Sequence, residues 1–161
     1  MPIVTSEIEA RFSGGAANSN PLASIGGAKS SVQVTAALFD DVDSTESQAG
    51  DTEYRCVYIH NANGTLTLQN PVIWLTAESP NYIDIGVGAS AINGTETAVA
   101  NENTAPAGVT FSSPANKGAG LALGNIPPGQ HRAVWVRRTI PPGAGAAAGS
   151  FSFRVEGDTL P

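Results

Sequence analysis

The side chains suited to acid–base or nucleophilic chemistry are few and widely separated in this sequence. Only His60 and His131 offer histidine bases, and Cys56 is the single cysteine. A hydrolase needs a nucleophile, a base and an orienting group that converge on one point. The chain contains no G-x-S-x-G, H-E-x-x-H or Walker motif that would bring such groups together. We therefore interpret both histidines as capping or surface residues and predict a non-enzymatic protein with no catalytic residues.

Two other short patterns have structural explanations. Gly27-Ala28-Lys29-Ser30 ends like a phosphate-binding loop, but Ala28 separates glycine from lysine and the spaced first glycine is missing. Cys56 lies in the middle of a predicted strand among apolar neighbours, whereas reactive cysteines need an accessible, electropositive environment. We predict a buried, inert thiol and no cofactor-binding residues.

The segment between Asp40 and Glu53 carries six carboxylates and no basic residue. Asp41, Asp43 and Glu46 have the hard oxygen ligands that Ca²⁺ prefers. Their spacing does not match an EF-hand, because Glu46 stands at the sixth loop position, where glycine is needed. We therefore assign no metal site and favour a solvated acidic loop that meets a basic partner surface. Cation binding by this loop stays open.

Trp74 and Trp135 are the residues that would suit a carbohydrate-binding module, because an indole ring can stack on a sugar. Both lie on predicted strands with apolar neighbours. Packing in the core or between subunits is therefore the favoured interpretation. A carbohydrate-binding sandwich used in host attachment is the alternative.

The composition indicates a single domain rich in strands. The 161 residues are enough to bury a sizeable core, while 18 glycines, 11 prolines and only 14% charged residues argue against long surface helices. The net charge of −6 provides no positive stripe for nucleic acid, and no apolar run approaches the ~20 residues of a membrane span. A single cysteine excludes an internal disulfide and suits a reducing site of synthesis. We expect neither nucleic acid nor membrane as a partner.

Short segments separated by turn residues predict an all-β fold, an antiparallel β-sandwich. The most informative segment is Asp51–Ala77, which predicts two strands joined into a hairpin by Asn61-Ala62-Asn63-Gly64. Apolar residues on both faces of the first strand indicate a central strand covered on two sides. Pro71 predicts a bulge or an exposed edge in the second. Strand order, which decides between an Ig-like sandwich and a jelly roll, stays open.

The predicted strands cover Glu7–Phe12, Val32–Leu38, Glu53–His60, Leu66–Ala77, Tyr82–Val87, Val109–Ser112, Leu121–Leu123, His131–Ile140 and Ser150–Glu156. Side chains of the same parity within a strand lie on the same face of its sheet. This parity predicts a core that depends on Val57, Ile59, Val134, Val136, Phe151 and Phe153.

Residues 1–30 are predicted to form an extended N-terminal arm, and residues 31–161 the sandwich domain. The segment from Phe12 to Ser30 consists mostly of Gly, Ala, Ser and Asn and has little to bury. We expect it to be flexible in a free monomer and to become ordered on a neighbouring subunit. A homo-oligomer is therefore expected.

Several segments give the chain a resemblance to a known family: FSGGAANSNP, LFDDVDSTES, AGDTEYRCVYIHNANGTLTLQN, NENTAPAGVTF, GNIPPGQHRAVWVRRT and RVEGDTLP. From about Glu7 to the C-terminus, the sequence resembles small structural proteins encoded among the virion genes of tailed bacteriophages and prophages. The resemblance implies a virion component, made in the host cytoplasm, that binds the major capsid protein or other virion proteins and has no enzyme site. A decoration or cement protein on the capsid head is the favoured role, and a tail, neck or baseplate component is the alternative.

Overall fold

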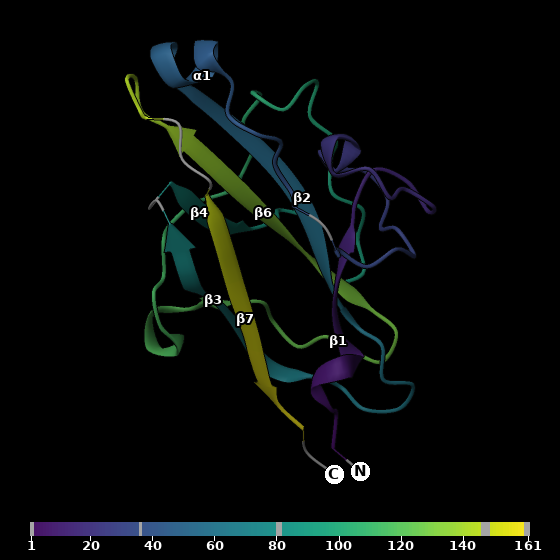
Figure 1. The fold of residues 1–161 in the computed structure, drawn as a ribbon. Helices are drawn as coiled ribbons and strands as arrows, with labels where there is room; N and C mark the ends of the chain where they lie inside the picture. Colours follow the sequence, from purple (N-terminus) through teal and green to yellow (C-terminus); the bar gives the residue numbers. More distant parts are fainter. Residues whose placement is uncertain (1, 36, 80–81, 146–148, 160–161) are drawn as a thin grey trace.

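The computed structural model describes residues 2–35, 37–79, 82–145 and 149–159 and contains two antiparallel sheets packed against each other (Figure 1). The prediction of an all-β sandwich is confirmed. One sheet has the order β1-β2-β6-β4 and the other β5-β3-β7. The strands are β1 (Ile8–Phe12), β2 (Asp51–Asn61), β3 (Gln69–Ser79), β4 (Ile83–Val87), β5 (Leu121–Ala122), β6 (His131–Ile140) and β7 (Ser150–Asp158). The helical elements are α1 (Ser44–Ala49) and the 3-10 turns Thr5–Glu7, Pro21–Ala23 and Lys117–Ala119. Within the described ranges, no helix has the length and apolar character needed to cross a membrane.

Consecutive strands from β2 to β7 alternate between the two sheets. In an immunoglobulin constant domain, the fifth strand lies between the second and the fourth. Here β6 takes that place, and β3 lies between β5 and β7 in the opposite sheet. The strand order is therefore not that of an immunoglobulin constant domain.

The hairpin predicted at Asp51–Ala77 is wrong, although both of its strands exist. β2 pairs with β1 and β6, whereas β3 pairs with β5 and β7 in the other sheet. The Asn-rich turn is a crossover between the sheets. The buried side-chain amide of Asn61 donates to the carbonyl oxygens of Leu66 (2.8 Å) and Ile126 (2.9 Å). These bonds direct the chain away from β2, so the turn does not close a two-stranded hairpin.

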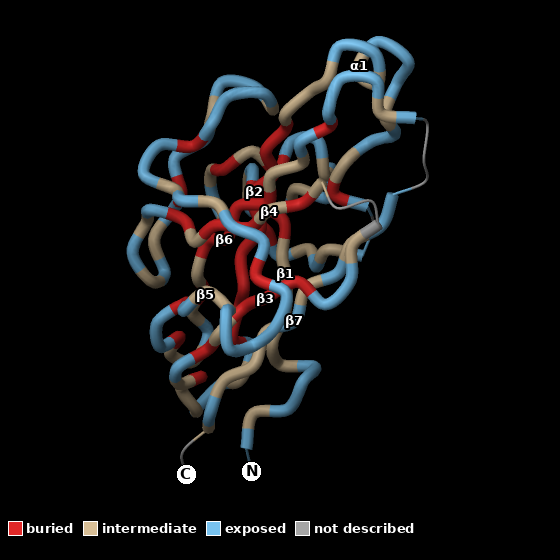
Figure 2. The backbone as a smooth tube through the Cα atoms, turned by 90° about the vertical axis from the view of Figure 1, so that its left-hand side faces the viewer, coloured by how far each residue is buried: buried red, intermediate tan, exposed pale blue. Residues whose placement is uncertain are grey.

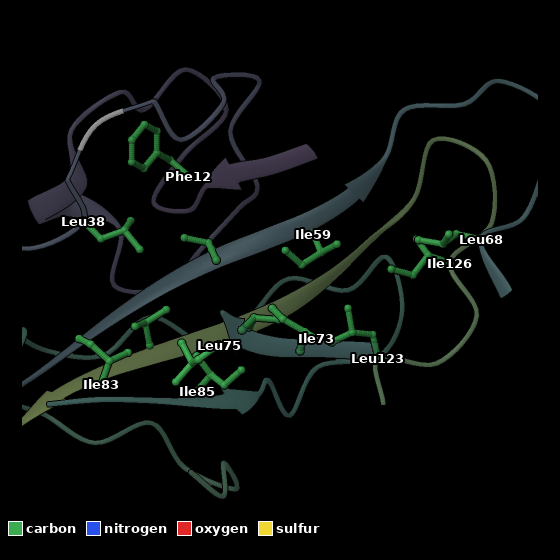
Figure 3. Close-up of a cluster of buried hydrophobic side chains, with 13 residues drawn as sticks. Phe12, Leu38, Ile59, Leu68, Ile73, Leu75, Ile83, Ile85, Leu123 and Ile126 are labelled. Carbon is green, nitrogen blue, oxygen red and sulfur yellow. The ribbon is translucent and has the colours of Figure 1, made fainter. Parts of the chain in front are cut away.

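The main core lies between the two sheets (Figure 3). Its buried apolar side chains are Phe12, Leu38, Val57, Ile59, Leu68, Ile73, Leu75, Ile83, Ile85, Leu123, Ile126, Val134 and Val136. They come from strands of both sheets and from positions outside the strands, namely Leu38, Leu68, Leu123 and Ile126. One continuous apolar cluster therefore joins the two sheets.

Pro71 interrupts the ladder of β3, as predicted. The register between β3 and β7 shifts between Gln69 and Val72, because proline has no N–H to donate. The irregularity allows Leu68 and Ile73 to enter the same inner core. Strict alternation would place these two side chains on opposite faces.

The predicted core is confirmed in its central part and corrected at β7. Val57, Ile59, Val134 and Val136 are at most 1% exposed. Phe151 and Phe153 pack against the same cluster but are only half-buried. The reason is position, since β7 is the end strand of the smaller sheet.

A second, smaller core covers the outer face of the four-stranded sheet. Its buried members are Tyr54, Cys56, Tyr58, Ala133 and Trp135. Because Val57 and Ile59 point to the main core, β2 is covered on both faces, as predicted, and every residue from Glu53 to Asn61 is buried. Figure 2 shows buried residues gathered along these central strands.

Residues 12–30 cover part of this outer face, which differs from the extended arm expected from their composition. The Ser13 hydroxyl donates to the Cys56 carbonyl at 2.8 Å, and the Cys56 amide donates to the Ser24 carbonyl at 2.7 Å. Tyr58 donates through its hydroxyl to the Gly27 carbonyl at 2.7 Å. Both serines are fully buried. Hydrogen bonds attach this segment to the sheet of its own chain. A composition poor in apolar side chains therefore led to the wrong expectation of an extended arm.

Two predicted strands are reduced to single bridges. In the range Val32–Leu38, of which residue 36 lies outside the described residues, only Gln33 forms a bridge. In the range Val109–Ser112, only Ser112 does. Apolar side chains of both segments still pack against a core. Alternation of apolar and polar residues indicates that one face of a segment is buried. It does not show that another strand lies beside the segment to pair with its backbone.

Candidate functional site

The most concentrated group of charges lies where β2 and β6 run side by side near α1 (Figure 1). Glu53 on β2 is directly opposite Arg138 on β6. The Arg138 Nε donates to Glu53 Oε2 at 2.6 Å, and Nη2 contacts the same oxygen. The side chain of Glu53 is only 1% exposed and that of Arg138 is 11% exposed. This is a buried ion pair, so removing one partner costs far more than it would at the surface.

Arg55 extends the pair into a network. Its fully buried guanidinium donates through Nη2 to Glu102 Oε2 at 2.5 Å, and Nη2 also lies 3.6 Å from Glu53 Oε1. The centre of the Phe39 ring lies 4.8 Å from Arg138 Cζ and 5.3 Å from Arg55 Cζ. Both distances allow a cation–π interaction. One aromatic ring therefore contacts both arginines.

The two arginines compensate Glu53 only in part. Burial raises the pKa of Glu53 to about 7, although the charges of Arg138 and Arg55 favour its ionised form. Among the described residues, no group donates a hydrogen bond to its Oε1. Buried polar atoms are rarely left in this state. The second oxygen of Glu53 is therefore a position where a further partner would fit.

Residues 40–53 contain the short helix α1, which sequence analysis missed. Asp43 is its N-cap, and Oδ1 accepts from the amides of Thr45 (2.7 Å) and Glu46 (2.8 Å). Glu46 Oε2 accepts in return from the Asp43 amide at 2.8 Å. This reciprocal pattern is a capping box, whose D-x-x-E signal stands in the sequence. Gly50, at φ +79°, follows the helix and turns the chain into β2.

The structure does not gather the set considered for Ca²⁺, because Asp43 caps α1 and Asp41 belongs to no carboxylate cluster in the described chain. A different set converges. Glu46, Asp51 and Glu53 each place one carboxylate oxygen within 4.8 Å of the others. Sequence reasoning did not select this set because the turn after α1 brings it together.

A cavity of about 910 Å³ lies beside the charged network. Its apolar lining includes Leu38, Phe39, Ile83, Phe151 and Phe153, and its charged lining includes Asp40, Asp41 and Arg138. The rings of Phe39 and Phe151 lie 6.2 Å apart. Its size falls within the range of ligand pockets, roughly 300–1,000 Å³. The described lining therefore combines an apolar part with three charged side chains.

The two candidate bases, His60 and His131, lie directly opposite each other on β2 and β6. They are buried, not exposed as expected. A ring nitrogen of His60 lies 3.1 Å from the Gln130 carbonyl, and one of His131 lies 3.1 Å from the Gly94 carbonyl. Burial lowers both pKa values, that of His60 to about 4. Two neutral imidazoles that bond to carbonyls have a structural role in the sheet.

The buried thiol predicted at Cys56 is confirmed, because this residue is fully covered and burial raises its pKa well above the usual value. The segment resembling a phosphate loop serves packing. The Gly27 carbonyl accepts from Tyr58, and the Ser30 amide donates to the Phe12 carbonyl at 2.8 Å. In the described chain, the first helix after Ser30 is α1, which begins only at Ser44, so no helix N-terminus adjoins Ser30 to complete a phosphate site.

Neither tryptophan offers an open face to a sugar. Trp135 is fully buried, and Trp74 is 8% exposed. The interpretation of both residues as packing residues is confirmed. The alternative of sugar stacking at these two positions has no exposed ring to use.

Glu96 is a second buried carboxylate that sequence analysis missed. Its oxygens accept from the amides of Ala89 (3.0 Å) and Ser90 (2.9 Å) and from Trp135 Nε1 (3.1 Å). Burial disfavours the ionised form, but these hydrogen bonds outweigh it and lower the pKa of Glu96. Glu96 and its loop partners Ala89 and Ser90 are distant in sequence from Trp135 on β6. No local sequence pattern therefore predicts that Glu96 contacts Trp135. For Glu53 and Arg55 a signal did exist, namely two charges inside an otherwise apolar strand.

Comparison of the chain with protein-family models, curated proteins and solved structures returned no match.

Proposed function

We propose that this chain is a non-enzymatic structural protein of a tailed-bacteriophage virion, made in the host cytoplasm and bound to the outside of the capsid head. The family resemblance of the sequence supports this role. The all-β sandwich is compatible with this role, although a fold by itself does not decide a function. The observation that carries the proposal is the large apolar cavity beside β7, which suits binding through contact area.

The cavity and the edge of β7 together form the proposed docking surface for the major capsid protein. Phe151 and Phe153 face the cavity and are half-buried, so a partner would remove further apolar surface from water. Within the described chain, β7 pairs only with β3. Backbone groups on its outer edge can therefore accept a strand of the partner.

The charge of the chain indicates the character of that partner. The net charge is −6, and Asp40 and Asp41 line the cavity. A capsid surface with an apolar projection between basic residues is complementary to this arrangement. Added salt should weaken the attraction, since charges near the surface are screened over about 8–10 Å at ordinary ionic strength.

Stabilisation of the head would follow from mass action. A protein that binds only the assembled lattice stabilises each site by RT ln(1 + [L]/Kd). Many weak sites then add up across the shell. Particles depleted of this protein should assemble but break at lower temperature or milder osmotic stress, and addition of purified protein should restore their resistance.

A surface variant tests the docking face. Phe151→Ser should abolish the restored resistance, because it removes an apolar contact at the cavity. Leu22→Ser is the matched control, since Leu22 is 47% exposed and does not line the cavity. Equal rescue by both variants would contradict the proposed docking surface, provided that circular dichroism shows both to be folded.

The tail or neck alternative is separated by counting copies in purified virions. A number that matches the shell lattice supports decoration, whereas a small ring-like number assigns the protein to the tail, neck or baseplate. The expected homo-oligomer is tested separately, by measuring the molar mass of the free protein with light scattering. Depleted particles with stable heads and defective tails would overturn the decoration role.

A further inference from the structure

We propose that Glu46, Asp51 and Glu53 form a binding site for a divalent cation, and that Ca²⁺ is the ion they fit. The site lies where the chain turns from α1 into β2 (Figure 1). It is independent of the role proposed in the virion, because it rests only on carboxylates of this chain.

The spacing of the three carboxylates suits one shared ion. One oxygen from each lies within 4.8 Å of the other two. Ca²⁺ binds oxygen at 2.3–2.6 Å, so two of its ligands are separated by at most about 4.6–5.2 Å. Asp51 and Glu53 are two positions apart on β2 and share a side of the strand. Glu46 reaches them across the turn at Gly50.

Existing hydrogen bonds position each carboxylate through one of its oxygens. Glu46 Oε2 accepts from the backbone that precedes α1 at 2.8 Å. Asp51 Oδ1 accepts from Asn103 Nδ2 at 2.8 Å, and Glu53 Oε2 accepts from Arg138. Among the described residues, the second oxygen of each group accepts no hydrogen bond. Three oriented carboxylates therefore retain oxygens for an ion.

Glu53 gives an independent indication that a ligand belongs here. Its side chain is 99% buried, and Oε1 has no hydrogen-bond donor among the described residues. Within the described ranges, the cation recorded nearest to that oxygen is Arg55 Nη2, at 3.6 Å. Leaving a buried charged oxygen in this state costs free energy. An ion shared with Glu46 and Asp51 would supply the missing partner.

The second set of converging carboxylates is Asp40, Glu53 and Glu102. Arginine side chains already fill that side of the cluster. Arg138 Nη2 lies 3.3 Å from Asp40 Oδ1, and Arg55 Nη2 lies 2.5 Å from Glu102 Oε2. Among the described residues, neither Glu46 nor Asp51 forms an ion pair, and Arg55 Nη2 comes no closer than 3.6 Å to Glu53 Oε1. The ion therefore belongs on that side.

The charge balance also favours a divalent ion. The carboxylates of the cluster are Asp40, Glu46, Asp51, Glu53 and Glu102, and the cations are Arg55 and Arg138. A divalent ion reduces the resulting negative excess. Glu46 and Asp51 are half-buried, so water can complete the coordination. Ca²⁺ fits better than Mg²⁺, because Mg²⁺ demands a near-ideal octahedron at 2.0–2.1 Å.

Isothermal titration calorimetry of the full chain with CaCl₂ tests the site. We expect one ion per chain with a Kd on the order of 10⁻⁴–10⁻³ M, as in sites of extracellular modules. Glu46→Gln and Asp51→Asn keep an oxygen for the existing hydrogen bonds but remove the charge. Each should weaken binding about tenfold or more.

Asp41→Asn is the matched control, because it removes one charge from the same segment outside the set of three ligands. Its affinity should stay within about twofold of the original chain. Circular dichroism must show that all variants are folded. If a variant unfolds, the test uses the melting temperature of the unaltered chain instead. Millimolar CaCl₂ should raise this melting temperature, and NaCl of equal ionic strength should leave it unchanged. No saturable binding, or equal weakening by Asp41→Asn and Asp51→Asn, would overturn the proposal.

Discussion

Glu53 and Arg138 lie 85 positions apart in the sequence, yet they face each other across β2 and β6 with 2.6 Å between Arg138 Nε and Glu53 Oε2. The pair belongs to the charged network beside Phe39, whose ring contacts the Arg138 guanidinium. Because Glu53 is fully buried and the Arg138 side chain is only 11% exposed, each charge depends largely on the other for compensation. This relationship makes the stability of the sandwich sensitive to a single charged side chain.

Removing one member of this pair should be more harmful than removing both. Arg138→Met should lower the free energy of unfolding by about 3–5 kcal/mol, because it leaves Glu53 buried without its main partner. The double variant Glu53→Leu/Arg138→Met should lose less, since apolar side chains replace both charges. Urea unfolding of the four proteins in this double-mutant cycle provides the measurement. Strictly additive losses would show that the two residues do not act as a pair.

Two phenylalanines provide a matched test of core position. Phe12 is 2% exposed, whereas Phe153 is half-buried beside the cavity. Phe12→Ala should cost roughly 3–5 kcal/mol, as for a fully buried ring, and Phe153→Ala should cost clearly less. The comparison uses urea unfolding under identical conditions. A larger loss for Phe153 than for Phe12 would contradict the half-covered position of β7.

Residues 12–30 should be protected from hydrogen exchange in the isolated chain. The Gly27 amide donates to the Glu96 carbonyl at 2.9 Å, and the Ser30 amide donates to the Phe12 carbonyl at 2.8 Å. Both amides should exchange much more slowly than that of Gly64, which is exposed and donates no backbone hydrogen bond in the described chain. Equally fast exchange at all three amides would show that this segment is open in solution.

Acid should destabilise the fold through His60. Its pKa is lowered to about 4 in the folded chain, chiefly by burial and further by Lys29 and Arg11. The unfolded chain, with an ordinary pKa near 6.5, binds the proton first as the pH falls. Stability that is complete above about pH 6.5 is therefore lost progressively as the pH falls toward about 4.

The variant His60→Asn isolates this contribution. Urea unfolding between neutral pH and about pH 4 should show a shallower loss of stability in the variant than in the original chain. His131 and the acidic residues titrate in both proteins, so the difference in slope belongs to His60. Identical slopes would contradict a lowered pKa for this histidine.

Much of the strand content was predictable from local pattern. His131–Ile140 was predicted with the bounds that β6 has, and the apolar residues on both faces of β2 correctly indicated a strand covered on two sides. Pro71 marked the bulge in β3. These features depend on side-chain parity and on the missing N–H of proline, which are properties of neighbouring residues. The capping box at Asp43 was equally readable and was overlooked.

Only the tertiary structure decided which strands pair and which charges meet. Alternation assigns a side chain to a face but names no neighbour, so the strands around Asn61 were joined into a hairpin although they belong to different sheets. Glu53 and Arg138 meet because β2 and β6 are adjacent, and Ser13 is buried because the segment that carries it folds over β2. The sequence by itself therefore determined most of the strands and their apolar faces. The order of the strands determined the buried Glu53–Arg138 pair and the cavity, since each joins segments that local pattern cannot connect.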